Sequence, residues 1–130
     1  MILFDTDICI EILRGNKKII QKRSEYSGEV SVSFMTVAEL YYGAENSQHP
    51  TENKLLVDKF LLTVDIIYTD IPILKRFGGI KSALKQRKTP LPDADLFIGS
   101  TALETSEALI TGNTKHFEKM PGLKIENWIR

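Results

Sequence analysis

Three carboxylates far apart in the sequence each stand where an apolar, strand-like run gives way to a helical one. Asp5 follows the apolar run 2–4, Glu39 lies one turn into the helix expected after a second strand, and Asp95 opens a third apolar segment. In an α/β domain such junctions converge on one edge of a parallel sheet, where ligands bind. Carboxylates gathered there repel one another unless a cation lies between them. The pattern therefore predicts a metal site formed by Asp5, Glu39 and Asp95.

The ligand types narrow the choice of metal. Oxygen ligands alone select hard cations, so Mg²⁺ is the expected cofactor and Mn²⁺ its alternative. Ions of this kind activate water and stabilise the in-line displacement of a phosphodiester. Asn113 follows a further strand-like run and offers one more oxygen at the same edge, and Asp93 is an additional candidate ligand beside Asp95. The predicted chemistry is metal-dependent phosphodiester hydrolysis.

Each of these residues also has a structural explanation. Asp7 and Asp93 stand where the N-caps of helices are expected, and Asn113 can cap the turn that follows it. Thr36 and Glu39 have the spacing of a capping box, in which the Glu returns a hydrogen bond to the cap residue. Several separate strand ends that each offer an oxygen ligand are nevertheless much rarer by accident than any one of them. The joint pattern therefore favours the metal site.

Apolar runs and amphipathic segments alternate along the 130 residues. Short strands are expected at residues 2–4, 30–34, 65–67, 108–110 and 123–125. Helices are expected at residues 8–14, 17–26, 36–44, 52–62, 70–88 and 93–104, with a helical turn at 115–117. Gly78-Gly79 marks a bend or a close-packing point. Because helices separate the strands, the expected fold is a single α/β domain of residues 1–130, with three α/β/α layers around a parallel sheet of about five strands.

Composition and charge exclude several classes of protein. The 17 basic and 17 acidic residues balance, which argues against a dedicated electrostatic DNA binder. No apolar run reaches the ~20 residues that cross a bilayer, and the N-terminus lacks the pattern of a signal peptide, so a cytoplasmic protein is expected. Cys9, the one cysteine, is expected to be a small buried residue. His49 and His116, the two histidines, are expected at the surface, with an approach of His116 to the substrate as the alternative. A histidine acid–base ribonuclease is therefore poorly supported.

One segment of the chain is strongly basic. Six lysines and arginines oppose a single acid between Asp70 and Lys88. A helix with a basic face beside an acidic metal site can hold a phosphate backbone. A solvated helix face is the alternative. The residues assigned to an RNA backbone are Lys81, Lys85, Arg87 and Lys88.

Four short motifs, in order, resemble those of the PIN-domain family, and within it those of the VapC toxins of bacterial and archaeal toxin–antitoxin pairs. They are DTDI at 5–8, TVAELYYG at 36–43, DLFIG at 95–99 and TGNTKHF at 111–117, before a tail that contains Trp128. Each motif alone is weak, but four in order at this chain length are specific. The resemblance covers essentially the whole chain.

This resemblance implies a Mg²⁺-dependent endoribonuclease toxin on a five-stranded parallel sheet. Members of the family inhibit translation by cutting structured RNA, often a tRNA anticodon stem-loop or a ribosomal RNA loop. They are usually dimeric and are silenced by a VapB-like antitoxin. An antitoxin of this kind is expected to lay an apolar segment and a basic residue across the pocket, with Leu40, Tyr41 and the helix at 55–61 as candidate contacts.

By position, the resemblance assigns the metal ligands to Asp5, Glu39 and Asp95. Asn113 falls where many PIN domains have a fourth acid, and Asp7 occupies a position that is often Asn. Thr36 and Thr111 are expected to donate hydrogen bonds to the ligand carboxylates. The expected catalytic set is therefore Asp5, Glu39, Asp95 and Asn113.

Two other functions are weighed against this one. A haloacid-dehalogenase-like phosphohydrolase would use Asp5 as a nucleophile and Asp7 as a general acid, but it also needs an acidic pair after Thr111. The chain has none, and Glu39 and Asp95 would go unused. A PIN-like module that binds RNA or protein without cutting is the second alternative. It is disfavoured because clustered carboxylates destabilise a fold that holds no cation.

Overall fold

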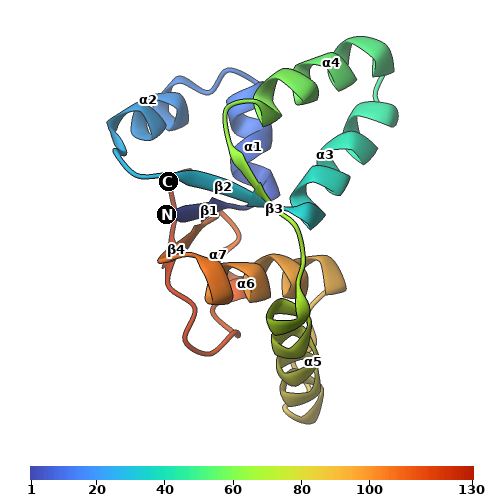
Figure 1. The fold of residues 1–130 in the computed structure, drawn as a ribbon, viewed down its shortest axis with the longest axis vertical. Helices are drawn as coiled ribbons and strands as arrows, with labels where there is room; N and C mark the ends of the chain where they lie inside the picture. Colours follow the sequence, from blue (N-terminus) through green and yellow to red (C-terminus); the bar gives the residue numbers. More distant parts are fainter.

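Five short strands form one parallel sheet in the computed structural model, which describes residues 1–130. The spatial order is β3-β2-β1-β4-β5, and every neighbouring pair is parallel. Figure 1 shows the strands between two groups of helices. The predicted three-layer α/β/α fold with a five-stranded parallel sheet is confirmed. The strands are β1 (Ile2–Phe4), β2 (Val30–Ser33), β3 (Asp65–Ile67), β4 (Ala108–Ile110) and β5 (Ile125–Glu126).

Seven helices cover the two faces of the sheet. In Figure 1 the first four lie above the strands and the last three below them. Helices α1 and α2 connect β1 to β2, α3 and α4 connect β2 to β3, and α5 and α6 lead from β3 back to β4. The helices are α1 (Thr6–Leu13), α2 (Lys17–Glu25), α3 (Phe34–Glu45), α4 (Pro50–Leu61), α5 (Ile71–Gln86), α6 (Asp93–Thr105) and α7 (Thr114–Phe117).

The return of the chain to β4 creates a topological switch point. Strands β2 and β3 lie on one side of β1, whereas β4 and β5 lie on the other. The loops that leave β1 and β4 therefore diverge at the carboxyl ends of these neighbouring strands. In open α/β sheets this crevice is where ligands bind. The residues after β1 and β4 are Asp5 and Thr111, so the fold places two predicted site residues at the switch point.

Alternating side chains of the strands divide the apolar core between the two faces. Ile2 and Phe4 pack with α1 to α4, whereas Leu3 and Leu109 pack with α5 to α7. All four are almost fully buried. Continuous apolar runs of this kind are typical of parallel strands that are covered on both faces. The core therefore fixes the register of β1 and β4, and with it the position of the residues that follow them.

Several local predictions were wrong or shifted. Helix α3 begins at Phe34 because Ser33, not Thr36, is its N-cap, and the Ser33 side chain accepts a hydrogen bond from Thr36 N. Helix α5 runs unbroken through Gly78 and Gly79, and no neighbouring atom lies within 4 Å of a Cβ at either glycine. The prediction of a close-packing point is therefore wrong, and the glycines do not interrupt the helix. The last strand lies at 125–126 rather than 123–125.

The predictions for Cys9 and for membrane segments can be compared with the structure directly. Cys9, a residue of α1, is fully buried in the apolar core, and burial raises the pKa of its thiol. The prediction of a small buried residue is confirmed. None of the seven helices combines the length and the apolar character that a membrane crossing requires.

Candidate active site at the carboxyl ends of the strands

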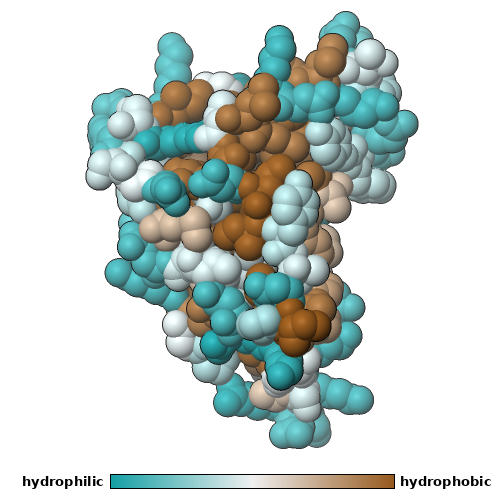
Figure 2. All heavy atoms as spheres, viewed as in Figure 1, coloured by the Kyte–Doolittle hydropathy of each residue, from teal (hydrophilic) through white to brown (hydrophobic).

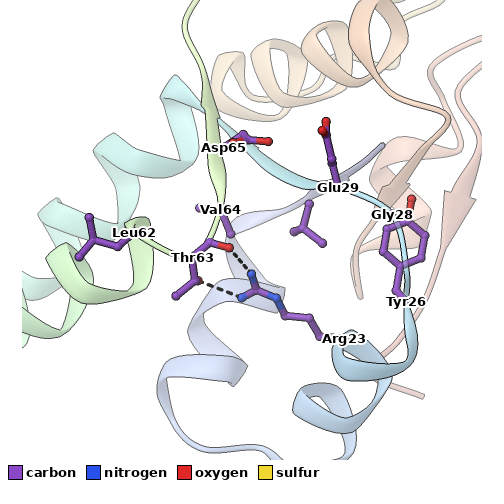
Figure 3. A pocket seen from close by; sticks show the side chains of 9 residues that line it. Arg23, Tyr26, Gly28, Glu29, Leu62, Thr63, Val64 and Asp65 are labelled. Carbon is purple, nitrogen blue, oxygen red and sulfur yellow. Dashed lines mark hydrogen bonds between the residues drawn. The ribbon is translucent and has the colours of Figure 1, made fainter.

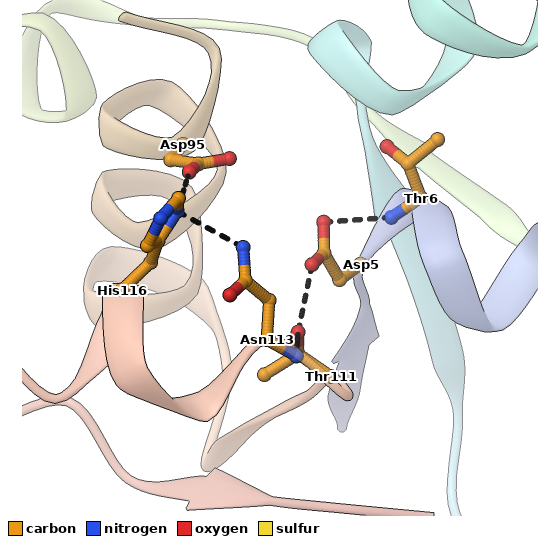
Figure 4. A network of polar contacts seen from close by, with 6 residues as sticks. All are labelled: Asp5, Thr6, Asp95, Thr111, Asn113 and His116. Atoms are coloured by element: carbon orange, nitrogen blue, oxygen red, sulfur yellow. Dashed lines mark hydrogen bonds and ion pairs between the residues drawn. The ribbon is translucent and has the colours of Figure 1, made fainter. Parts of the chain in front are cut away.

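Asp5 is the most deeply buried carboxylate of the site, with only 6% of the residue exposed. It follows β1 directly and caps helix α1, where its carboxylate accepts a hydrogen bond from Thr6 N at 2.7 Å. The second carboxylate oxygen accepts a hydrogen bond from the Thr111 hydroxyl, also at 2.7 Å. These bonds hold the Asp5 side chain across the switch point between β1 and β4 (Figure 4).

Glu39 reaches the same region from helix α3. Its carboxylate accepts a hydrogen bond from the Thr6 hydroxyl at 2.7 Å, and the Thr6 and Thr36 hydroxyl oxygens lie 3.0 Å apart. Glu39 has no role in a capping box, since the N-cap of α3 is Ser33. Thr6 adjoins Asp5 in the chain and therefore links the two acids. Its role was not predicted, because a Thr beside an acid carries no signal in the sequence.

Asp95 joins the site through His116. The Asp95 Oδ2 atom, in the first turn of α6, lies 2.8 Å from His116 Nδ1 on α7. The same ring nitrogen lies 2.9 Å from the Asn113 side-chain amide, and Asn113 N donates a hydrogen bond to the Thr111 hydroxyl. Figure 4 shows a continuous polar network from Asp95 through His116, Asn113 and Thr111 to Asp5. His116 is therefore more than the surface residue that was predicted.

Asp7 also faces the switch point, although it was expected to cap α1. Asp5 is the N-cap, and Asp7 lies in the first turn, where its Oδ2 atom accepts a hydrogen bond from Gly112 N at 2.8 Å. The other oxygen, Oδ1, is buried and has no hydrogen-bond partner. A buried carboxylate oxygen without a partner is costly, so this atom has unused capacity to bind a donor or a cation.

The electrostatics of the site reflect the crowding of these acids. Burial, and next the charge of Asp7, raise the pKa of Asp5 from 3.8 to about 7, while the hydrogen bonds from Thr111 and Thr6 oppose the rise. Burial also raises the pKa of Asp7, and the charge of Asp95 adds to the effect. The ionised forms of Asp5 and Asp7 are therefore destabilised in the metal-free site, and a bound cation would stabilise them.

The donors fit a hard divalent cation in kind but do not form a ready cage. No three histidine, cysteine, aspartate or glutamate side chains are arranged as a metal-binding group. Thr6 contacts one carboxylate oxygen of Glu39, and His116 contacts one carboxylate oxygen of Asp95. The second oxygen of each carboxylate is therefore left for a ligand. Carboxylate oxygens and the unpartnered Asp7 Oδ1 are the donors that Mg²⁺ and Mn²⁺ prefer. The assignment of individual ligands stays a prediction.

Asp93 lies apart from this network. Pro92, not Asp93, is the N-cap of α6, and the exposed Asp93 carboxylate pairs with Lys81 at 2.9 Å. The pair attaches the basic helix α5 to the first turn of α6, which also carries Asp95. The other three residues assigned to an RNA backbone, Lys85, Arg87 and Lys88, are exposed at the end of α5.

A polar pocket at the opposite edge of the sheet has a structural role. It lies beside the amino-terminal ends of β2 and β3 and is lined by Arg23, Tyr26, Glu29 and Asp65, among others (Figure 3). The Arg23 guanidinium donates hydrogen bonds to the Thr63 hydroxyl and carbonyl oxygen, so it ties α2 to the turn before β3. The pocket lies at the amino-terminal ends of the strands, whereas the switch point lies at their carboxyl ends.

An apolar groove adjoins the acidic site. It has a volume of about 320 Å³ and lies between α1, α3 and α4, in the upper half of the molecule, where Figure 2 shows exposed apolar residues. Glu39 lines this groove and also contacts Thr6, so the groove and the acidic site are continuous. Tyr41 instead donates its hydroxyl hydrogen to Asp58 on α4. The apolar lining consists of Ile10, Leu13, Leu40, Ala44, Leu56 and Val57.

Comparison with known proteins identifies the family. The model of the PIN domain matches residues 2–123. The chain belongs to the PIN-domain family. This PIN domain is 31% identical to ribonuclease VapC2 of Haemophilus influenzae over 128 residues, which are 98% of this chain and 97% of that protein. It is 30% identical to the tRNA(fMet)-specific endonuclease VapC of Shigella flexneri over 127 residues, or 97% of this chain and 96% of that protein.

Solved structures extend the similarity to the whole fold. The toxin chain of DNA-bound VapBC from Salmonella typhimurium superposes on this PIN domain with a TM-score of 0.92 at 28% identity, over 98% of this chain and 97% of that one. VapBC-1 from nontypeable Haemophilus influenzae gives a TM-score of 0.90 at 30% identity, over the full length of both chains. The predicted membership of the VapC branch is confirmed, and the haloacid-dehalogenase-like alternative is excluded.

Proposed function

We propose that this chain is a Mg²⁺-dependent endoribonuclease, with Mn²⁺ as an alternative ion, and the toxin of a VapBC-type pair. In this proposal it is a single PIN domain of residues 1–130 that acts in the cytoplasm, cleaves structured RNA and thereby inhibits translation. One observation carries the proposal: a continuous polar network joins Asp5 to Asp95 across the switch point, where burial, and next the charge of Asp7, raise the pKa of Asp5 to about 7. A divalent cation and a phosphodiester are the ligands that such a site can accept.

The roles of the residues follow from their positions. Asp5, Glu39 and Asp95 would hold the ion directly or through water. Thr6, Thr36 and Thr111 would keep the carboxylates oriented. Asn113 sits between Thr111 and His116 and would orient the scissile phosphate. When bound, the ion supplies a Lewis acid for the phosphoryl oxygen and lowers the pKa of the attacking water. The proposed products carry a 5′-phosphate and a 3′-hydroxyl.

The substrate is proposed to be a tRNA anticodon stem-loop, with a ribosomal RNA loop as the alternative. A relative at 30% identity is named a tRNA(fMet)-specific endonuclease, which supports the first choice. The contact between Lys81 and Asp93 brings the basic helix α5 to the edge of the acidic site. Lys81, Lys85, Arg87 and Lys88 could then bind phosphates that flank the cleaved bond, and cleavage should weaken as salt is added.

The function is tested by incubating the purified protein with tRNA and ribosomal RNA in Mg²⁺, in EDTA, and in EDTA followed by excess Mg²⁺ or Mn²⁺. Cleavage should occur in Mg²⁺, stop in EDTA and return with either ion. Cleavage that persists in excess EDTA would contradict the metal mechanism. Binding of Mg²⁺ without cleavage of any RNA would favour a non-catalytic binding module.

The partner is proposed to be a VapB-like antitoxin that occupies the groove between α1, α3 and α4. The groove offers an apolar surface that ends at Glu39, so an apolar segment followed by a basic residue would match it. Neighbouring solved structures are VapBC complexes, one of which is described as bound to a DNA fragment from their promoter. Of the predicted contacts, Leu40, Leu56 and Val57 line the groove, whereas Tyr41 pairs with Asp58. A homodimer of the toxin remains part of the proposal.

Replacing Leu56 by Glu should release the toxin from inhibition. Leu56 lines the groove and is 49% exposed, so a charge there opposes an apolar partner without entering the core. RNA cleavage in Mg²⁺ should stay within about 2-fold of wild type, while the antitoxin concentration needed for half inhibition should rise at least ~10-fold. Leu62→Glu is the matched control, because Leu62 is 87% exposed and lies outside the groove. Equal inhibition of both variants would place the antitoxin elsewhere.

A further inference from the structure

We propose that His116 is a positioning residue that holds the Asp95 carboxylate, through a hydrogen bond from Nδ1–H, in the orientation that RNA cleavage requires. The inference rests on the proposed function of the site. His116 Nδ1 lies 2.8 Å from Asp95 Oδ2, and the structure gives the Asp95 side chain no other hydrogen bond. The orientation of Asp95 therefore depends on this one contact.

The surroundings of His116 suit a fixed support. The ring comes from α7, a helical turn of four residues whose last member, Phe117, is fully buried beneath α6. The His116 side chain is 41% exposed and that of Asp95 is 19% exposed, so the carboxylate is the more buried member of the pair. Phe117 thus anchors the turn, and the turn places the ring against Asp95. An acid on one element is held by a donor on another.

The chemistry of the ring decides which nitrogen carries the hydrogen. An ionised carboxylate only accepts hydrogen bonds, so the contact with Asp95 requires a hydrogen on Nδ1. A nitrogen that donates to Asp95 cannot also accept from the Asn113 amide nitrogen, which lies 2.9 Å away. Rotation of the Asn113 amide by 180° would present its oxygen to Nδ1–H instead. His116 would then orient Asp95 and Asn113 with a single donor.

Two substitutions separate this role from a direct contact with RNA. Asn at position 116 places an amide NH₂ close to the position of Nδ1, whereas Gln places one close to that of Nε2. If His116 positions Asp95, Asn should replace it, because the donor is needed at the position of Nδ1. If His116 contacts the substrate through Nε2, Gln should replace it instead. Ala removes both donors. Lys115→Ala is the matched control, since Lys115 is exposed on the same short turn and is no part of the polar network.

The experiment measures Mn²⁺ affinity by calorimetry and RNA cleavage at saturating Mn²⁺ for the wild type and these four variants. His116→Ala should weaken Mn²⁺ binding about 10- to 100-fold, as is typical when the support of a ligand is removed. His116→Asn should return to within about 3-fold of wild type, whereas His116→Gln should behave like Ala. Lys115→Ala should match the wild type, and equal melting temperatures across the set should show that the fold is intact.

Two results would overturn the inference. Unchanged Mn²⁺ affinity in His116→Ala would show that Asp95 needs no support from the ring. Rescue of cleavage by Gln but not by Asn would assign His116 to the substrate instead. If the wild type cleaves RNA and binds Mn²⁺ and the Ala variant is unaffected, this inference is refuted but the proposed function stands. A wild type that binds no Mn²⁺ refutes the proposed function as well.

Discussion

Replacing Asp5 by Asn should abolish RNA cleavage and at the same time stabilise the metal-free protein at neutral pH. The two effects have one cause. Asp5 is buried beside Asp7, and its pKa is raised from 3.8 to about 7. The ionised form is therefore costly in the absence of a cation, yet it is the form that binds one. Asn has nearly the same shape without the charge, so it removes both the cost and the metal ligand.

The direction of the pH dependence follows from this raised pKa. A carboxyl group whose pKa is higher in the folded than in the unfolded state stabilises the fold fully below the unfolded pKa of 3.8, and this stabilisation is lost as pH rises to about 7. For Asp5 alone, the free energy of unfolding of the metal-free protein should fall by ~2–3 kcal/mol between pH 5 and pH 8. Asp7, whose pKa is also raised, contributes in the same direction.

Urea unfolding in EDTA at pH 5 and pH 8 measures the effect. The Asn variant should lose most of the decrease seen in the wild type. At pH 8 it should be more stable than the wild type by ~3 kcal/mol, because full ionisation of Asp5 costs ~4 kcal/mol and one weakened hydrogen bond offsets about 1 kcal/mol of that gain. Glu29→Gln, an exposed change at the opposite edge of the sheet, should leave the pH dependence unaltered. An Asn variant that is less stable than the wild type at both pH values would contradict the account.

The second large effect is expected at Asp95, with its neighbour Asp93 as the internal comparison. Asp95 contacts His116 inside the polar network, whereas Asp93 is exposed and pairs with Lys81. Asp95→Asn should lower RNA cleavage at least ~100-fold, because loss of a ligand costs more than the 10- to 100-fold loss typical of its supporting contacts. Asp93→Asn should retain cleavage within ~5-fold, since a surface ion pair contributes ~1 kcal/mol or less.

Single-turnover cleavage of the same RNA by both variants, at one Mg²⁺ concentration and matched melting temperature, measures the difference. The pair shares a helical turn, so a general disturbance of α6 would affect both. A large loss in Asp93→Asn with an active Asp95→Asn would mean that the ion lies on the α5 side of the site. That outcome would exchange the roles assigned to the two acids.

The sheet and the convergence of its strand ends could be predicted because apolar runs are local signals. Residues 2–4 and 108–110 are continuous apolar runs followed by polar residues, and both became buried parallel strands. A short buried strand between helices admits few topologies, so the positions of Asp5 and Thr111 followed from the pattern. The ends of helices were harder to predict. Ser33 and Thr36 are both good caps, and only the exact end of β2 decides between them.

The supporting residues of the site could not be predicted from local signals. Thr6, His116 and Gly112 act through atoms that lie more than 20 residues away in the chain: Thr6 holds Glu39, His116 holds Asp95, and Gly112 N donates to Asp7. Such contacts depend on the packing of α1, α3, α6 and α7 around the switch point. A threonine, a histidine or a glycine is common at the surface, so its type alone carries little information.

The glycine pair in α5 shows the opposite error. Gly78-Gly79 predicted a bend or a close-packing point, yet α5 continues through both glycines and no atom lies within 4 Å of a Cβ placed on either. Two helical glycines cost about 2 kcal/mol relative to alanine. Asp70, whose side chain caps the first turn, and the buried residues Ile73 and Leu84 on either side of the glycines hold the helix in place. Packing on both flanks therefore outweighs the local preference.

The central claim is that Asp5 and Asp95, from different elements, share one divalent cation. The most direct measurement is a crystal structure of the wild type grown in Mn²⁺, with data collected at a wavelength where manganese scatters anomalously. The account predicts an anomalous peak at the switch point between β1 and β4, with oxygens of Asp5 and Asp95 at ~2.2 Å. A structure that shows no peak there while RNA is still cleaved in the same buffer would contradict it.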